Sequence, residues 1–210
     1  MNIINLGGNF MVDVYISPSV QHFNLGQQGY GSEEARMNEV ADVVEYELNR
    51  HGLVTARNNP SMTLAQVVED SNNVNPRVHV ALHSNAANGE ARGAEIYTHR
   101  FGGEGEALAR DIYPYLEALT PTEDLGVKEG RLSFGGKGMY ELKNTNAPAV
   151  LAEIAFHDNP EDSDFVINNV YEYGRDISKG ILDYFGIPYN EDSEENISYL
   201  KNRYNGNYFE

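Results

Sequence analysis

Residues 78–85 read VHVALHSN, and this stretch decides the fold class. Its β-branched and apolar residues run up to His83, and the small polar segment NAANG (85–89) follows. This pattern predicts a buried strand that ends in a loop. In open α/β sheets, ligand sites form beyond the carboxyl ends of the strands, where His83 would lie. A lone His is more often a hydrogen-bonded structural residue, so His83 needs support from the rest of the chain.

The composition limits the class of protein and the kind of site. The 210 residues fit one domain of ordinary size, and their net charge is −17. This charge argues against nucleic acid as a partner, because nucleic acid demands a basic surface. No stretch approaches the ~20 apolar residues of a membrane span, so we expect no membrane insertion. The chain has no cysteine, so a metal would need His, Glu, Asp or amide oxygens as ligands.

Strand patterns alternate with helical patterns along most of the chain, which predicts an α/β sandwich. Residues 120–138 contain Pro121 and five glycines and are predicted to form a long loop, of a kind that is more often functional than accidental. The predicted strands are 12–16, 53–56, 78–84, 94–98, 139–142 and 149–155, and the predicted helices are 32–50, 63–70, 105–119, one that begins at Asn159, and 173–185.

Changes in composition predict where the folded domain begins and ends. We expect one domain over residues 12–186, with residues 1–11 as an N-terminal extension. Residues 187–210 are rich in Asn, Glu, Asp, Ser and Tyr and are predicted to be an acidic linker or a short C-terminal appendage. Residues 1–10 lack a basic start and a long apolar run, so no secretory signal is expected.

Two carboxylates give His83 the support it needs. Glu153 lies within the otherwise apolar strand 149–155, where an unpaired carboxylate is costly, so it needs a cation, a metal or a metal-bound water. Glu34 lies at the start of the first predicted helix. Taken alone, Glu153 could pair with an Arg or Lys, and Glu34 could simply favour the helix dipole.

Three segments of the chain together resemble a known family. They are HSNA (83–86) with RGAE (92–95), Glu34 followed four residues later by Asn38, and APAVLAEIAF (147–156) with NPED (159–162). In this order they resemble the zinc-dependent N-acetylmuramoyl-L-alanine amidases, bacterial and phage enzymes that cut peptidoglycan. The resemblance covers about residues 12–186. It implies a three-layer α/β sandwich with a mixed, mostly parallel sheet of about six strands flanked by helices.

The resemblance also implies a site with one Zn²⁺ ion held by three side chains, usually His, Glu and His. It makes Glu34 and His83 metal ligands and Glu153 the catalytic residue. The family's first His is missing from its usual place after the first strand, where this chain reads SPSVQHFN. Imidazole chemistry favours His22 as the third ligand, whereas the register of the S-P-S-x-Q-x-x-N pattern favours Gln21, and both stay open.

Zinc chemistry then predicts the reaction. A catalytic zinc keeps one position open for water, lowers the pKa of that water and polarises a carbonyl. Glu153 would take the water's proton and return it to the leaving amine. The bond cut would join the lactyl group of N-acetylmuramic acid to L-alanine of the stem peptide. Asn85, His157 and the loop 126–138 are predicted to hold substrate, although a His such as His157 is more often a turn residue.

Two other functions fit the same pattern. A missing first ligand would suit a non-catalytic module that binds the cell wall, and a zinc peptidase of similar architecture would release amino acids from the stem peptide. For the amidase, peptidoglycan is the expected partner. The lack of a signal peptide favours a phage endolysin over a bacterial autolysin. Such an enzyme is made in the cytoplasm and acts on the wall after release.

Overall fold

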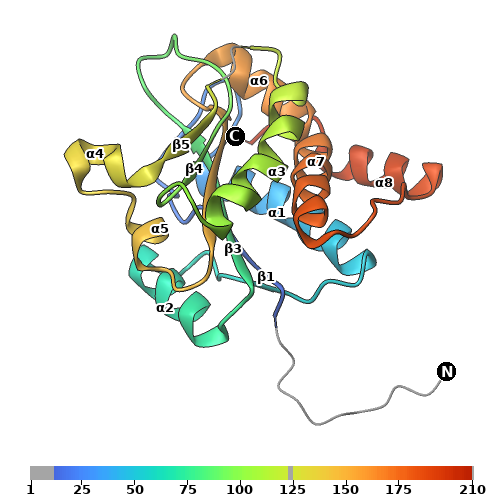
Figure 1. Ribbon diagram of the computed structural model, residues 1–210. Helices are drawn as coiled ribbons and strands as arrows, with labels where there is room; N and C mark the ends of the chain where they lie inside the picture. The colour runs from blue at the N-terminus through green and yellow to red at the C-terminus, as the bar shows by residue number, and fades with distance from the viewer. Residues whose placement is uncertain (1–11, 123–124, 210) are drawn as a thin grey trace, which may run out of the picture.

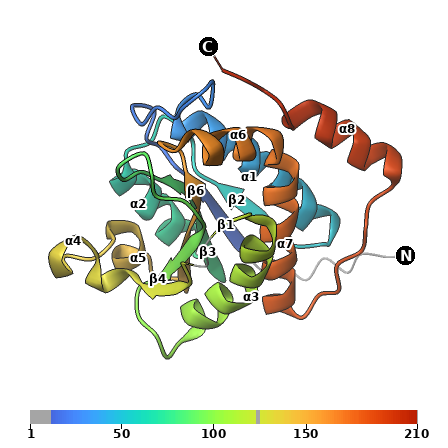
Figure 2. The ribbon, with the colours of Figure 1, turned by 90° about the horizontal axis from the view of Figure 1, so that it is seen from above.

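The computed structural model describes residues 12–122 and 125–209. Within them, helices flank both faces of a six-stranded sheet, which confirms the predicted α/β class (Figures 1 and 2). The sheet has the order β2-β1-β3-β6-β4-β5, and of its neighbouring pairs only β6 and β4 are antiparallel, so β4 and β5 run opposite to the other four strands. The mixed, mostly parallel sheet is therefore confirmed. The strands are β1 (Val14–Pro18), β2 (Thr55–Arg57), β3 (Val78–Asn85), β4 (Glu95–Thr98), β5 (Val127–Glu129) and β6 (Ala149–Phe156).

The helices form two unequal layers. One face of the sheet is covered by the long helices α1 (Glu33–Arg50), α3 (Glu104–Leu119) and α7 (Val170–Phe185). The other face carries α2 (Leu64–Val74) and the short α5 (Tyr140–Asn144), and α6 (Pro160–Asn168) follows β6. None of the helices in the described residues combines the length and the apolar composition that a membrane crossing demands.

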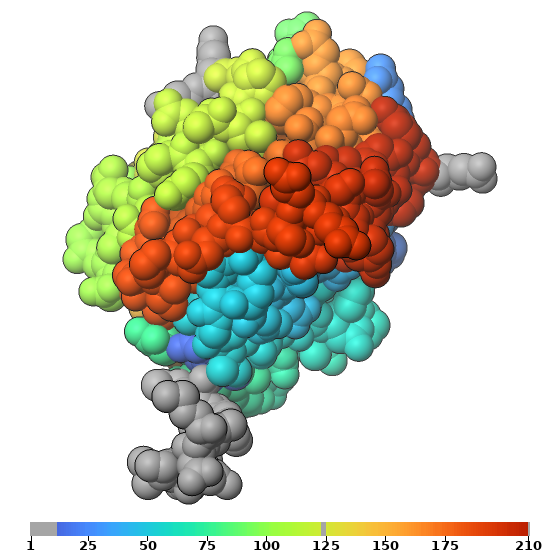
Figure 3. Space-filling view, turned by 90° about the vertical axis from the view of Figure 1, so that its right-hand side faces the viewer, coloured from blue at the N-terminus to red at the C-terminus, as the bar shows by residue number. Residues whose placement is uncertain are grey.

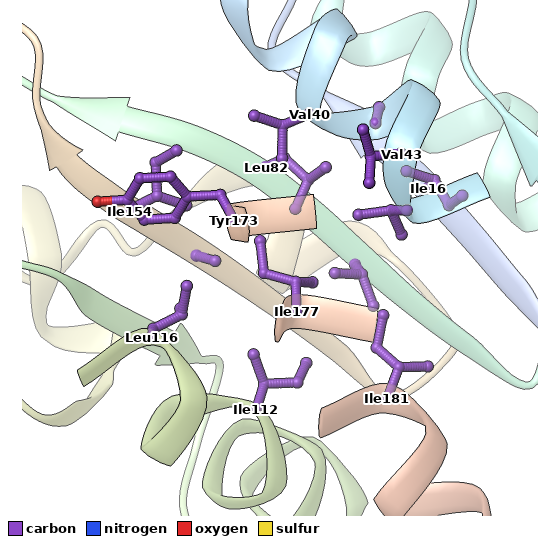
Figure 4. Packing of buried hydrophobic residues seen from close by; sticks show 14 of the residues in the cluster. Ile16, Val40, Val43, Leu82, Ile112, Leu116, Ile154, Tyr173, Ile177 and Ile181 are labelled. Atoms are coloured by element: carbon purple, nitrogen blue, oxygen red, sulfur yellow. The ribbon is translucent and has the colours of Figure 1, made fainter. Parts of the chain in front are cut away.

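The core explains which strand residues can reach a site. The larger apolar cluster lies between the sheet and the long helices, where Leu82 and Ile154 face Ile112 and Ile177 (Figure 4). A smaller cluster on the opposite face consists of Ala81, Met139, Leu142, Ala149 and Leu151. Successive strand residues point to opposite faces, so His83 and Glu153 lie on the face of the smaller cluster.

The start of α1 is fixed by a side-chain cap at Ser32. The Ser32 hydroxyl accepts a hydrogen bond from the backbone N–H of Ala35 at 3.1 Å. This bond satisfies one of the free N–H groups at the helix start. Glu33 is consequently the first helical residue, and its side chain turns inward toward the sheet and is 1% exposed.

The C-terminal segment, predicted as a linker or short appendage, contains a docked helix. Leu200 and Tyr204 of α8 (Glu194–Tyr204) are buried in the larger cluster. Beyond α8, the fully buried Arg36 donates from Nη2 to the backbone oxygen of Asn207 at 2.7 Å, and its guanidinium lies 4.6 Å from the centre of the Phe209 ring. Figure 3 looks onto this side, where the red and orange C-terminal residues lie beside the cyan of α1.

Two predictions for the chain between α3 and β6 are wrong. Residues 139–142 are not a strand, because α5 begins at Tyr140, and Met139 and Leu142 are buried in the smaller cluster. A segment of four residues is too short for the spacing of Met139 and Leu142 to distinguish a strand from one turn of helix. The predicted loop 120–138 contains β5, the 3₁₀ turn η1 (Gly130–Leu132) and α4 (Ser133–Gly136). An edge strand as short as β5 depends on its pairing with β4, which no local pattern reveals.

The close approach of α3 and α7 gives the first testable prediction. A Cβ added to Gly180 would lie 2.3 Å from the Ile112 Cα, and backbone atoms cannot move aside cheaply. We expect Gly180→Ala to lower the free energy of unfolding by about 1–3 kcal/mol, measured by denaturant titration. Glu117→Ala, at an exposed position of the facing helix α3, is the control and should change it by about 0.5 kcal/mol or less. Equal stability of Gly180→Ala and the wild type would contradict this packing.

Candidate active site

His83 and Glu153 are neighbours at the carboxyl end of the sheet. β3 and β6 pair in parallel with His83 opposite Glu153. On the other side of β3, the last residue of β1, Pro18, is paired with Leu82, and the segment that carries Gln21 follows it. The carboxyl ends of three adjacent strands therefore bring these side chains to one place, as open α/β sheets commonly do.

The carboxylate that contacts His83 belongs to Glu33. Its Oε1 lies 2.7 Å from His83 Nδ1, and its Oε2 accepts a hydrogen bond from Asn24 Nδ2 at 2.8 Å. Burial alone would raise the pKa of Glu33, but its bonds to His83 and Asn24 and the charge of His83 lower it below the ordinary value. Glu33 is thus held ionised against the ring.

Glu34, the predicted ligand, follows Glu33 in the first turn of α1 and lies differently. Adjacent helical residues point about 100° apart, so Glu33 and Glu34 cannot both face His83 in the same way. Glu34 is partly exposed, and its backbone oxygen accepts a hydrogen bond from Asn38 Nδ2 at 2.7 Å. The structure therefore brings Glu33 rather than Glu34 to the imidazole.

Gln21 and His22, the two alternatives for the third ligand, lie differently. Gln21 Nε2 is 3.5 Å from His83 Nδ1, while Gln21 Oε1 accepts a hydrogen bond from Asn24 Nδ2 at 3.0 Å. His22 is exposed, and its ring packs edge-on against Phe23 with the two centres 5.5 Å apart. Of the two, Gln21 contacts the Glu33–His83 pair.

A second carboxylate, Glu141 of α5, lies on the far side of the His83 ring. Its Oε2 is 3.7 Å from His83 Nε2, and its Oε1 lies 2.8 Å from His79 Nε2 and accepts a 2.5 Å hydrogen bond from Ser17. Burial would raise the pKa of Glu141, but the two histidines lower it far below the ordinary value. His79 also contacts Ser71 at 2.9 Å, so a buried polar chain runs beneath the site.

Glu141 is a site residue that the sequence analysis does not single out. Its segment, MYEL, fits the strand predicted over residues 139–142, and one acid in so short a strand has no obvious partner. His79, four residues before His83 on β3, is fully buried and stacked on Tyr15 with ring centres 5.3 Å apart. The spacing of His79 and His83 on one strand face could have suggested that a shared carboxylate lies over both.

Glu153 carries the unpaired oxygen of the site. Its Oε2 is buried and has no hydrogen-bond partner. Burial, aided by the charges of Glu33 and Glu95, raises the pKa of Glu153 to about 8, although the charge of His83 acts against this. A buried polar atom without a partner is uncommon in proteins and often marks a functional position.

Asn85 and His157, the predicted substrate-binding residues, have partners within the protein. Asn85 Nδ2 donates to Glu95 Oε1 at 2.7 Å. His157 is 3% exposed, and its Nδ1 lies 2.9 Å from the backbone oxygen of Ser84. Neither belongs to the set of described residues that line the cavity at His83 and Glu153. The structure therefore gives both residues a place in the framework and does not bring them to the cavity surface.

A cavity of about 720 Å³ opens above these groups. His83, Glu141 and Glu153 line its floor, and side chains from the segment after β1, from α2 and from the region of α4 and α5 form its walls. A concave site with a few convergent polar groups and a carboxyl of raised pKa is the arrangement expected of an active site.

The side chains around His83 meet part of what a metal ion needs. In the described part of the chain, no three His, Cys, Asp or Glu side chains lie close enough to hold one. Glu33 and His83 are, however, ligands that zinc prefers, and the Gln21 amide faces the same ring nitrogen. If the Gln21 amide turned by 180°, its oxygen would face the ion. The hydrogen bond that this oxygen now accepts from Asn24 would then be lost. Glu33, His83 and Gln21 therefore fit one divalent ion, with Gln21 as the weak third ligand. The unpaired oxygen of Glu153 lies at the same end of the sheet.

Comparison with known proteins assigns the family. Residues 14–183 match the family model for N-acetylmuramoyl-L-alanine amidase, which is most of the chain. The chain belongs to this family. It is 28% identical over 181 residues to N-acetylmuramoyl-L-alanine amidase LytC of Bacillus subtilis, a match that covers 82% of this chain and 35% of LytC. An uncharacterized cell wall amidase of Bacillus anthracis is 28% identical over 137 residues, 60% of this chain and 24% of that protein.

Solved structures of amidases share the fold of this family member. The catalytic domain of CwlV, an amidase from Bacillus (Paenibacillus) polymyxa var. colistinus, superposes with a TM-score of 0.73 at 22% identity, over 85% of this chain and 100% of that domain. The chain spans about a third or less of the length of the two curated relatives above. The match to CwlV therefore concerns the fold of a catalytic domain.

The raised pKa of Glu153 predicts how the stability of metal-free protein depends on pH. Between pH 4.5, the ordinary pKa of a glutamate, and about pH 8, Glu153 keeps its proton in the folded protein but has lost it in the unfolded chain. The contribution of Glu153 to the free energy of unfolding therefore falls as pH rises through this window. In chelator, Glu153→Gln should gain stability relative to wild type from about pH 5 to about pH 8, measured by denaturant titration. If the stability of Glu153→Gln differs from that of the wild type by the same amount at both pH values, the raised pKa of Glu153 is contradicted.

Proposed function

We propose that this chain is a zinc-dependent amidase that cuts the bond between the lactyl group of N-acetylmuramic acid and L-alanine in peptidoglycan. One observation carries the proposal: the buried, unpaired oxygen of Glu153 lies at the same sheet end as the Glu33–His83 pair, in the floor of a large cavity. Membership of the amidase family supports it.

Glu33, His83 and Gln21 are the proposed zinc ligands. A neutral His83 ring protonated at Nε2 would turn its proton toward Glu141 and present the lone pair of Nδ1 to the ion. Metal-bound histidines commonly direct their second nitrogen to such a carboxylate, which fixes the tautomer and the orientation of the ring. Glu141 is therefore proposed as a positioning residue. An amide oxygen is a poorer zinc ligand than imidazole, so weaker metal binding is expected.

Glu153 is the proposed acid and base. When bound, zinc polarises the substrate carbonyl and lowers the pKa of a water towards ~7. Burial keeps Glu153 protonated at neutral pH in metal-free protein, and a positive charge nearby would favour the carboxylate form that a base requires. Glu153 then accepts a proton from the attacking water and returns it to the leaving nitrogen of L-alanine.

The adjacent acids Glu33 and Glu34 form a matched pair for testing the ligand assignment. Glu33→Gln should weaken zinc binding by more than about 100-fold, beyond the loss typical of residues outside the ligand set. Glu34→Gln should bind zinc as wild type does. Competition with a fluorescent chelator gives both affinities without any measurement of activity. Loss of zinc in Glu34→Gln, with retention in Glu33→Gln, would restore Glu34 as the ligand.

The second test of function concerns the bond that is cut. Glu153→Gln should lower kcat by at least about 100-fold on purified cell walls while zinc binding persists, because the variant lacks the base. Mass spectrometry of the digest should show stem peptides with new L-alanine N-termini. Released free amino acids would instead indicate a peptidase. Binding to walls without zinc uptake or cleavage by the wild type would indicate the non-catalytic module, which the amide at the third ligand position favours.

We place this activity at the cell wall, in a lytic enzyme such as a phage endolysin or a bacterial autolysin. The similarity to LytC supports an amidase of this general kind. Loss of turbidity of intact Gram-positive walls, absent in Glu153→Gln, is the corresponding readout.

A further inference from the structure

We propose that the apolar rim of the cavity above Glu153 binds the glycan strand of peptidoglycan, with Phe23 and Phe134 as stacking surfaces for its sugar rings. The inference rests on the proposed function, because it names which part of that substrate the cavity takes. It assigns the sugar to this side of the catalytic groups and leaves the stem peptide to the other side.

Exposed apolar side chains gather at this cavity. Among the described residues, ten large hydrophobic side chains are exposed, and four of them line it: Phe23 (68% exposed), Leu64 (37%), Phe134 (72%) and Tyr140 (49%). They come from the segment after β1 and from α2, α4 and α5. In Figure 1, α2, α4 and α5 lie together on one side of the sheet. Exposed apolar surface that collects around a cavity indicates a ligand site, whereas scattered residues need no explanation.

The backbone at Phe134 supports a functional role. Its φ is +53° and its ψ is +41°, in the left-handed region that bulky residues rarely adopt. Gly135 and Gly136 follow with positive φ, so the turn already contains residues that tolerate this conformation. A phenylalanine placed there bears strain while its ring stays largely exposed, and the packing of the fold does not account for it.

The apolar rim of the cavity favours a neutral ligand. Its lining contains no Lys or Arg within the described residues, and its charged groups are confined to the floor, at His83, Glu141 and Glu153. The stem peptide bears free carboxylates, for which this rim offers no cationic partner. Sugar rings of the glycan are uncharged and offer apolar C–H faces that suit aromatic rings. A second cavity, of about 570 Å³, is lined by Arg92 and Lys128 together with the acids Glu90 and Glu95.

The absence of tryptophan from the chain permits a direct test. Phe134→Trp keeps an aromatic surface and introduces a single indole as a fluorescent reporter. The probes are a tetramer of β-1,4-linked N-acetylglucosamine, which is neutral and lacks the scissile amide, and a synthetic stem pentapeptide. We expect a saturable change of indole emission with the tetramer and none with the pentapeptide. Tyr199→Trp, on α8 across the sheet, is the control and should respond to neither.

Binding affinity gives a second readout. In isothermal titration with the tetramer, Phe134→Ala and Phe23→Ala should each raise Kd about tenfold, as expected for loss of an aromatic anchor. Tyr199→Ala should leave it unchanged. A response of Phe134→Trp to the pentapeptide, or to neither probe, would overturn the inference, as would unchanged Kd values in the alanine variants. These experiments need no hydrolysis, so failure of the amidase assay and failure of glycan binding are separate results.

Discussion

The contact between Glu33 Oε1 and His83 Nδ1 is the interaction on which the site depends. It joins the first residue of α1 to the end of the central strand β3 across a buried interface, and each element is fixed by its own means. The Ser32 cap fixes where the helix begins, and pairing with β1 and β6 fixes the strand. A buried carboxylate and imidazole held this way are ordered before any ligand arrives, which is what metal binding and catalysis require.

The acids around His83 outnumber the cations available to balance them. Glu33 and Glu141 lie at the two ring nitrogens, and Glu153 follows across the strand pair. Hydrogen bonds to Glu141 and Glu33 raise the pKa of His83 against the effect of burial, so one imidazolium offsets one of these charges. Burial, aided by the charges of Glu33 and Glu95, raises the pKa of Glu153 to about 8, so Glu153 remains protonated at neutral pH. A divalent ion would relieve the same excess of acids, so the donor set is consistent with zinc, although Gln21, the proposed third ligand, would be a weak one.

The sequence was most informative where a polar residue lies within an otherwise apolar segment. His83 and Glu153 could be predicted because polar groups stand out in apolar strands, and the two-residue period of a strand fixes their face. Glu33 was missed because the two acids at the helix start are equivalent in the sequence. Only the position of the capping residue determines which of them faces the sheet. Glu141 was missed because its four-residue segment fits a strand and a helical turn equally well. The partner of Asn85 could not be predicted, because the register between β3 and β6 shifts between His83 and Asn85, an irregularity that no local pattern indicates.

The most direct test of this account is a crystal structure of zinc-soaked protein with anomalous data collected at the zinc edge. We predict one peak at about 2.0–2.2 Å from both His83 Nδ1 and a Glu33 carboxylate oxygen, with the Gln21 amide oxygen as the third protein ligand. No peak at this position, or a peak whose neighbours are Glu34 or His22, would contradict the central claim that the Glu33–His83 pair is the metal-binding element of the fold.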